Sequence, residues 1–196
     1  MENPQPVTTE RIFYAYLKVA RVAESTKDIS LAKIAEELGV SRQAIYKNHF
    51  QNIEELTQSL HYYVDNKPYQ QLKCFAFHDK NHSFKELLNF FAENVIPSLY
   101  EKHEFLGVFY SKVADPAWRP YLHQQYIDML IPYFNGANGN QHELTSQTLA
   151  ELTINQVMAA ISIWLTHEEP IKPEIFAQRF IYLFSNSILD LAEMSD

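Results

Sequence analysis

The 196-residue sequence is poor in glycine and cysteine, and each shortage excludes a class of protein. Glycine makes up 4 of the 196 residues, about 2%, whereas its usual share is about 7%. This scarcity disfavours β-folds that need many tight turns. The phosphate-binding motifs GxGxxG and GxxxxGK[ST] and the nucleophile motif GxSxG are all absent. The single cysteine, Cys74, excludes an intramolecular disulfide and a cysteine-based zinc cluster, and it fits a reducing compartment.

Long apolar runs are also lacking. The best is Val157–Leu165, far short of the roughly 18 residues that a membrane span needs. The N-terminal segment MENPQPVTTE has neither the basic nor the apolar region of a secretory signal. We therefore expect a cytoplasmic protein with no membrane partner.

Acidic residues exceed basic ones, and the formal net charge is −8. The excess is uneven: residues 1–67 carry 8 Lys and Arg against 9 Asp and Glu, whereas residues 68–196 carry 8 against 15. The segment 41–50 holds Arg42 and Lys47 and no acid. A cationic spot of this size is usually only a solvated surface, so it needs a second signal before it indicates nucleic acid.

Apolar periodicity predicts helices throughout, hence an all-α fold of about nine helices. In the segment 31–38, Leu31, Ile34, Ala35 and Leu38 follow the spacing of one helical face, after Ser30 as N-cap. Further helices are predicted over 9–23, from Ser41 to about Lys47, and from Asn52 to about Asn66, where Pro68 breaks or kinks the chain. Later helices are expected to begin near Ser83, Pro97 and Asp115, and two more to cover about 143–166 and 173–191.

The first three helices have the spacing of a helix-turn-helix. Ala35 is small where the second and third helices approach, and Gly39 lies in the turn four residues later. Val40 and Ile45 point inward. An ordinary corner between two helices could show the same residues, so the spacing favours DNA binding without establishing it.

The segment ISLAKIAEELGVSRQAIY, residues 29–46, resembles the N-terminal domain of the tetracycline-repressor (TetR) family. Ile34-Ala35, Gly39-Val40-Ser41 and Ile45-Tyr46 match the family pattern, as do Phe50 and Leu56 further on. Two positions depart from it: three residues instead of two separate Tyr46 from Phe50, and Ile53 stands where the family has lysine. Both departures concern the DNA contacts after Tyr46.

The resemblance implies that the third helix enters the DNA major groove. Arg42 and Gln43 are then the base readers, since Arg pairs with guanine and Gln with adenine, and Ala44 can touch a thymine methyl. Tyr46, Lys47, Ser30 and His49 would hold phosphates. The predicted DNA-binding residues are Ser30, Ser41, Arg42, Gln43, Ala44, Tyr46, Lys47 and His49.

The remaining chain, residues 53–196, is expected to form an effector-binding and dimerisation domain after a DNA-binding domain at 1–52. The last predicted helix is apolar nearly all round, which favours burial against a second subunit, and the family dimerises through its last two helices. Predicted interface residues are Ile154, Met158, Ile161, Leu165, Phe180 and Phe184. Aromatic residues suit a pocket for a small lipophilic or aromatic effector, with Tyr63, Phe91, His103, Phe105, Phe109, Trp118 and Tyr126 as candidate lining. The same aromatics could simply fill a core.

The sequence thus predicts a homodimeric regulator, a repressor that binds double-stranded DNA at a palindromic operator and is released by a small effector. No enzyme activity, catalytic residues, cofactor or metal site is predicted. One alternative is a TetR-like interaction module, a coactivator or anti-repressor, that has lost DNA binding. A second is an enzyme or carrier that uses the aromatic cavity.

Overall fold

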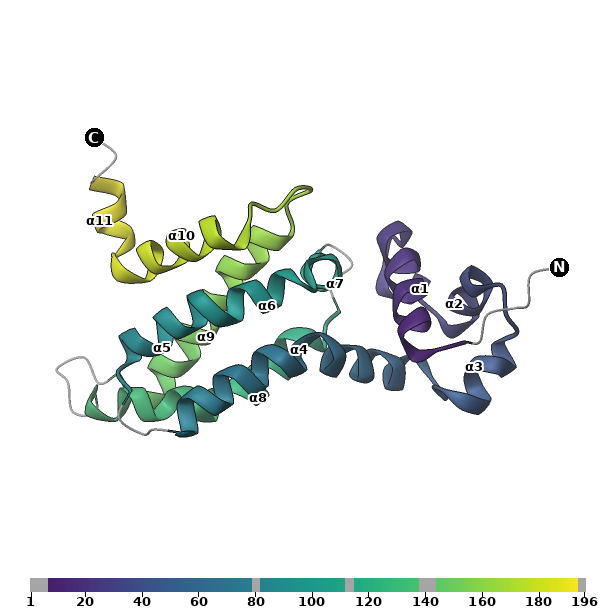
Figure 1. Ribbon diagram of the computed structural model, residues 1–196, viewed down its shortest axis with the longest axis horizontal. Coiled ribbons are helices and arrows are strands. Elements are labelled where there is room, and N and C mark those ends of the chain that lie inside the picture. Colours follow the sequence, from purple (N-terminus) through teal and green to yellow (C-terminus); the bar gives the residue numbers. More distant parts are fainter. Residues whose placement is uncertain (1–6, 79–81, 112–114, 138–143, 194–196) are drawn as a thin grey trace.

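The computed structural model describes residues 7–78, 82–111, 115–137 and 144–193, and in these ranges the regular structure is all helical. The predicted all-α fold is confirmed. Three helices lie together at one end of the molecule: α1 (Thr9–Val22), α2 (Leu31–Leu38) and α3 (Arg42–Asn48). From there α4 (Ile53–His78) runs into a larger helical body (Figure 1).

The turn between α2 and α3 forms as its sequence predicts. The Ser30 hydroxyl accepts the N–H of Lys33 at 3.4 Å and begins α2. Gly39 ends α2 with φ 67°, a left-handed conformation that costs glycine little. The Ser41 hydroxyl then accepts the N–H of Ala44 at 3.3 Å and begins α3. The predicted caps are therefore confirmed.

Helix α4 does not stop at Pro68, and here the prediction was wrong. The helix spans 26 residues and continues ten residues beyond that proline. Val64, Pro68 and Leu72 are all buried on one face, so packing holds the helix on both sides of the ring. A proline removes one backbone hydrogen bond, and the burial of this face offsets that loss.

The body contains more α-helices than expected, because some predicted helices are divided. Within the described residues it comprises α5 (Phe84–Phe90), a π-helical turn (Phe91–Val95), α6 (Ile96–Tyr100), α7 (His103–Phe109), α8 (Trp118–Leu130), a 3₁₀ segment (Ile131–Ala137), α9 (Ser146–Leu165), α10 (Pro173–Ser185) and α11 (Ile188–Glu193); a short 3₁₀ turn (Thr26–Asp28) precedes α2. The helix expected to begin at Pro97 instead continues from α5 through the π turn. The final predicted helix is interrupted at Asn186, whose backbone is extended.

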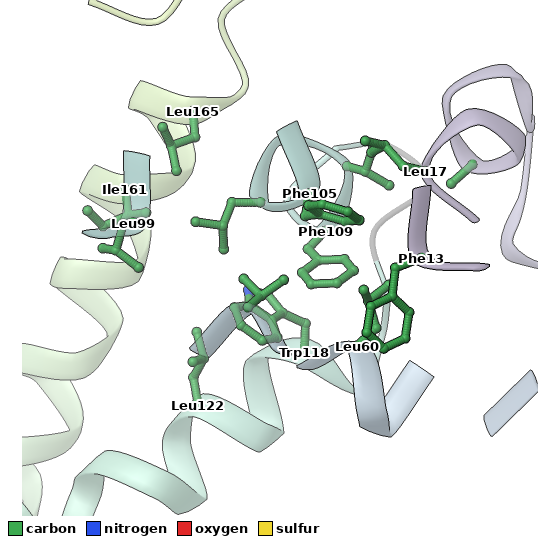
Figure 2. Packing of buried hydrophobic residues seen from close by; sticks show 14 of the residues in the cluster. Phe13, Leu17, Leu60, Leu99, Phe105, Phe109, Trp118, Leu122, Ile161 and Leu165 are labelled. Atoms are coloured by element: carbon green, nitrogen blue, oxygen red, sulfur yellow. The ribbon is translucent and has the colours of Figure 1, made fainter. Parts of the chain in front are cut away.

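Helix α9 lies in the interior of the body, against α7 and α8, and buries Ile154, Met158 and Trp164. Its length and composition alone would suffice to cross a membrane. Part of the helix is packed inside the subunit, since Ile161 and Leu165 face the cluster around Leu99 and Phe109 (Figure 2). This part of the core supports the cavity described below.

The turn at Gly39 can be tested by two substitutions. Val in place of Gly39 should destabilise the protein by about 1–2 kcal/mol, because a β-branched residue is strained at φ 67°. Asn at the same position should lower the free energy of unfolding clearly less than Val, because Asn tolerates the left-handed region. No other atom lies within 4 Å of the new Cβ position, so crowding does not confound the comparison. Urea unfolding measures both; equal losses would contradict the conformational explanation.

Candidate nucleic-acid interface and ligand pocket

Helix α3 presents polar and cationic side chains to solvent. Ser41, Arg42, Gln43 and Lys47 are exposed, and the Ser41 cap holds the start of the helix in place. On the opposite face Ile45 is fully buried and anchors α3 against the core. The remaining predicted contact residues, Ser30, Ala44, Tyr46 and His49, are half-buried. One surface therefore offers hydrogen-bond donors, acceptors and positive charge.

Arg42 and Tyr46 form a pair that sequence reasoning did not identify. One guanidinium nitrogen of Arg42 donates to the Tyr46 hydroxyl at 2.5 Å, and the guanidinium lies 4.9 Å from the ring centroid. Their spacing of four residues, one helical turn, was the available signal. Arg42 keeps further N–H groups for an acceptor such as guanine. Arg42 and Tyr46, two of the predicted DNA-contact residues, therefore lie together on the surface of α3.

The extra residue between Tyr46 and Phe50 is absorbed at the end of α3. His49 leaves the helical conformation, and the N–H of Phe50 reaches back to the carbonyl of Ile45 at 3.2 Å. Phe50 is buried and stacks on Phe13 of α1 with ring centroids 6.0 Å apart. The core contact after the insertion is thus kept, and the irregularity is confined to His49.

Four residues predicted for the pocket, Tyr63, His103, Phe105 and Phe109, do not line the cavity described below. Tyr63 and Phe105 pack at the junction of α1, α4 and α7, where Phe13 and Tyr14 contact them. Lys102 lies 3.8 Å from the centroid of the Tyr63 ring. His103 stacks on Tyr100, and Phe109 packs against His61 and Trp118. Aromatic content alone did not separate rings that fill the core from rings that line a cavity.

A cavity of about 90 Å3 lies in the body and is lined by residues of α4, α5, the π turn, α6, α7, α8 and α9. Phe91, Trp118 and Tyr126, three of the predicted residues, line it. Most of the other lining residues are aliphatic, among them Leu72, Leu87, Met158 and Ile161. Apolar walls of this kind suit a lipophilic ligand.

One wall of the cavity carries a buried carboxyl, Asp65 of α4. It is 2% exposed, and the Tyr126 hydroxyl donates to its Oδ1 at 2.7 Å. Burial raises the pKa of Asp65 to about 6, although the hydroxyls of Tyr126 and Tyr121 act in the opposite direction. Burial likewise raises the pKa of Tyr110, on the same wall, to about 12. Sequence reasoning missed Asp65; its signal was a charged residue on the apolar face of α4.

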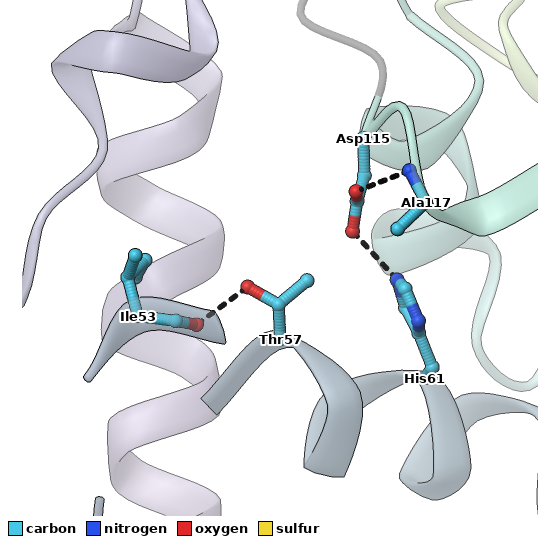
Figure 3. A network of polar contacts seen from close by, with 5 residues as sticks. All are labelled: Ile53, Thr57, His61, Asp115 and Ala117. Atoms are coloured by element: carbon cyan, nitrogen blue, oxygen red, sulfur yellow. Dashed lines mark hydrogen bonds and ion pairs between the residues drawn. The ribbon is translucent and has the colours of Figure 1, made fainter. Parts of the chain in front are cut away.

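A second polar contact ties α4 to the start of α8. His61 Nε2 lies 2.6 Å from Asp115 Oδ2, and the Ala117 N–H donates to Asp115 Oδ1 at 2.9 Å (Figure 3). Burial alone would raise the pKa of Asp115, but the hydrogen bonds from His61 and Ala117 lower it below its ordinary value. One turn earlier on α4, the Thr57 hydroxyl donates to the Ile53 carbonyl at 2.8 Å. The same helix therefore follows α3 in the chain and carries the cavity's buried carboxyl, Asp65.

The predicted dimer residues require a correction. Ile154, Met158, Ile161, Leu165 and Phe180 are each at most 5% exposed, so they pack inside the subunit and cannot contact a partner. Phe184 is half-buried. Exposed apolar residues lie on other faces of the same helices: Leu152 and Ile163 on α9, Ile175 and Tyr182 on α10. Periodicity identified apolar helices and could not say which apolar face meets solvent.

Among the described residues, no three His, Cys, Asp or Glu side chains gather as metal ligands would. Cys74 is exposed on α4. Of the two buried carboxyl contacts described above, one pairs Asp65 with a tyrosine and the other pairs Asp115 with a histidine.

Comparisons with known proteins agree with this arrangement. A family model described as a helix-turn-helix domain matches residues 17–69, which include α2, α3 and the first half of α4. The fatty acid degradation regulator FadR from Bacillus halodurans is similar in structure, with TM-score 0.68 and 14% identity over 92% of this chain and 100% of that chain. No curated protein matches the sequence.

Two further solved structures are similar over nearly the whole chain. The TetR-family transcriptional regulator PfmR from Thermus thermophilus has TM-score 0.57 and 19% identity, covering 93% of this chain and 97% of that one. A TetR/AcrR-family transcriptional regulator from Thermobifida fusca has TM-score 0.53 and 15% identity, covering 92% and 97%.

The fold therefore defines a protein with an N-terminal helix-turn-helix domain and a larger helical body. More particularly, over about nine-tenths of its length the chain has the fold of the TetR-family transcriptional regulators, and the resemblance seen in its sequence is confirmed at the level of the fold. The helix-turn-helix domain and this fold support a DNA-binding transcriptional regulator.

Replacing Asp65 by Asn tests the buried carboxyl. Folding raises its pKa from 3.8 to about 6, so the native state binds the proton more tightly and wild-type stability falls as the pH rises from about 4 to about 6. The Asn variant lacks this charge and should exceed the wild type in unfolding free energy by about 2 kcal/mol at pH 8, with the difference shrinking at pH 4.

Urea unfolding at pH 4, 6 and 8 measures the difference. Asp128→Asn, which changes an exposed carboxyl on α8, serves as the control and should alter stability little at any of these pH values. A less stable Asp65→Asn protein at pH 8 would show that the carboxylate is stabilised in the fold.

Proposed function

We propose that this protein is a cytoplasmic transcriptional repressor that binds a palindromic DNA operator as a homodimer and is released by a small lipophilic effector. The observation that carries the proposal is the exposed face of α3, where Arg42, Gln43 and Lys47 stand at the surface of a helix-turn-helix. Arg42 and Gln43 are in the first turn of the helix, the part that contacts base edges in this motif. Ser30, Ser41, Tyr46, Lys47 and His49 are proposed phosphate contacts, and Ala44 a thymine-methyl contact.

We place the division between the DNA-binding domain and the effector-binding body at residues 52 and 53, where α4 begins. One such domain offers little net positive charge, since residues 1–52 carry 7 Lys and Arg against 6 Asp and Glu. A second copy doubles the phosphate contacts and the base contacts, which is why a dimer on a two-fold operator is favoured.

The exposed apolar residues of the last helices support the dimer. Leu152 and Ile163 on α9 are 57% and 67% exposed and lie three turns apart on the same face. Ile175 and Tyr182 on α10 are similarly exposed and lie two turns apart. Both helices belong to the body and lie far from α2 and α3 (Figure 1). A partner that covers these residues leaves both copies of α3 free to face DNA.

Helix α4 offers a route from the cavity to DNA. Its first turn lies beside α3, while Asp65, Pro68 and Leu72 line the cavity further along. An effector that binds better to a conformer with a different spacing of the two α3 helices would shift the population away from the DNA-bound form. Equal spacing in the DNA-bound and effector-bound forms would overturn this mechanism.

The first experiment is fluorescence anisotropy with labelled DNA from upstream of the protein's own gene, against scrambled DNA, at two salt concentrations. A regulator should bind the upstream DNA more tightly than scrambled DNA, and its affinity should fall with salt because counterions are released on binding. Equal affinity for both would place the operator elsewhere.

Two substitutions sharpen that test. Arg42→Ala and Gln43→Ala should each weaken binding to the operator by about 1–3 kcal/mol, while affinity for scrambled DNA changes much less for Gln43→Ala. Lys73→Ala, which removes an exposed cation on the second half of α4, is the matched control and should leave operator affinity unchanged. Loss of affinity in the control and in the α3 variants alike would indicate general charge effects.

The dimer is tested separately. Ile163→Asp puts a charge into the proposed interface and should convert the dimer to a monomer in sedimentation equilibrium, because a buried unpaired charge is costly. Val22→Asp changes an 83% exposed apolar residue at the end of α1 and should leave the dimer intact. Retention of the dimer by Ile163→Asp would place the interface on another surface.

An interaction module that has lost DNA binding is the second candidate. Two observations favour it: residues 68–196 have a net charge of −7, and Ile53 replaces a lysine of the family pattern. The absence of salt-dependent binding to either DNA at low salt would select this function over the first.

A further inference from the structure

The carboxyl of Asp65 is incompletely paired. Its Oδ1 accepts the Tyr126 hydroxyl, but its Oδ2 is buried and has no hydrogen-bond partner among the described residues. The nearest lysine along α4, Lys67, is paired with Glu101 at 2.6 Å. A buried oxygen without a donor costs free energy, and a donor on a ligand would recover it.

A second buried polar atom without a partner among the described residues belongs to Trp118, which also lines the cavity. The indole Nε1 of Trp118 is buried and, within the described part of the chain, has no partner in hydrogen-bonding geometry. Tyr110 lies close to both groups. Burial is the main cause that raises the pKa of its hydroxyl; the Asp65 charge also raises this pKa, and Trp118 lowers it. The polar atoms of Asp65, Tyr110, Trp118 and Tyr126 therefore gather at one part of the cavity, and the rest of the lining is nearly all apolar.

The backbone beside this cavity departs from α-helical geometry in the π-helical turn. Phe91 and Val95, which line the cavity, begin and end that turn. Single π turns inside α-helices occur often at functional sites.

We infer that the cavity binds an apolar molecule with one hydrogen-bond-donating head group, a hydroxyl or an amine, and discriminates against a carboxylate. This inference rests on the proposed function in treating the cavity as the effector site. The head group donates to Asp65 Oδ2, and a hydroxyl head can also accept from Trp118 Nε1. A carboxylate head is an acceptor only and would place a second negative charge beside Asp65 in a poorly polarisable interior.

The cavity volume limits the ligand's size. About 90 Å3 is less than the roughly 150 Å3 of an engineered apolar cavity that binds benzene, so a short chain fits and a longer one must widen the site. A matched series with one chain and three heads separates the effect of the head group from the effect of size. Suitable probes are 1-butanol, butylamine and butanoate, together with the corresponding hexyl compounds.

Isothermal titration calorimetry on the full chain at pH 8, without DNA, measures the dissociation constants. The alcohol and the amine should bind at least about ten-fold more tightly than the carboxylate of equal length. In Asp65→Asn that ratio should fall to about three-fold or less, because the repelling charge is gone. Thr153→Val also changes a polar residue of the cavity wall, whose hydroxyl donates to the Leu149 carbonyl, and it should keep the ten-fold ratio.

Two results would overturn the inference. One is a carboxylate that binds the wild type as tightly as the alcohol of the same length. The other is no binding of any compound up to millimolar concentration, which would make the cavity a packing void. Anisotropy with operator DNA tests the proposed function separately: a head-group preference without DNA release would contradict effector control and leave the inference intact.

Discussion

Burial of one face of α4 is the constraint on which the rest of this structure depends. Leu56 and Leu60 are buried at the end of the helix that adjoins α1, and Val64, Pro68 and Leu72 continue the same face into the body. A helix of this length spans about 39 Å, enough to belong to both parts of the molecule. Because both parts share this one helix, it is the element through which we propose that a change in the cavity wall reaches α3.

That shared helix also explains where the polar groups lie. His61 and Asp65 stand one turn apart on a largely apolar face, and each is partnered by a residue from the α8 region, Asp115 or Tyr126. Buried polar groups hold packed helices in one arrangement only when they are paired. Both carboxyl oxygens of Asp115 have a hydrogen-bond partner, whereas Asp65, on the cavity wall, has a buried oxygen without one in the described chain. The first contact therefore fixes α8 on α4, and the second leaves a place for a ligand.

The helix-turn-helix and its exposed residues were predictable from the sequence, and the reason is that they are local. Ser30, Gly39 and Ser41 act through contacts within a few residues, so their caps and turn appear in the structure as the sequence indicates. The Arg42–Tyr46 pair follows from one helical turn in the same way. The course of α4 past Pro68 was not predictable locally, because burial of Val64 and Leu72 by distant helices outweighs the proline.

By itself the sequence determined an all-α chain, its first three helices, and which side chains of α3 meet solvent. Those properties depend on interactions between residues close along the chain, such as caps, turns and helical periodicity. The tertiary structure alone decided which aromatic rings line the cavity and which apolar face of α9 remains exposed. Ile154 and Leu152 are equally apolar and only two residues apart, yet one is buried and the other open. Their difference is set by the elements packed against α9, namely α7, α8 and the 3₁₀ segment, which the periodicity of α9 itself does not reveal.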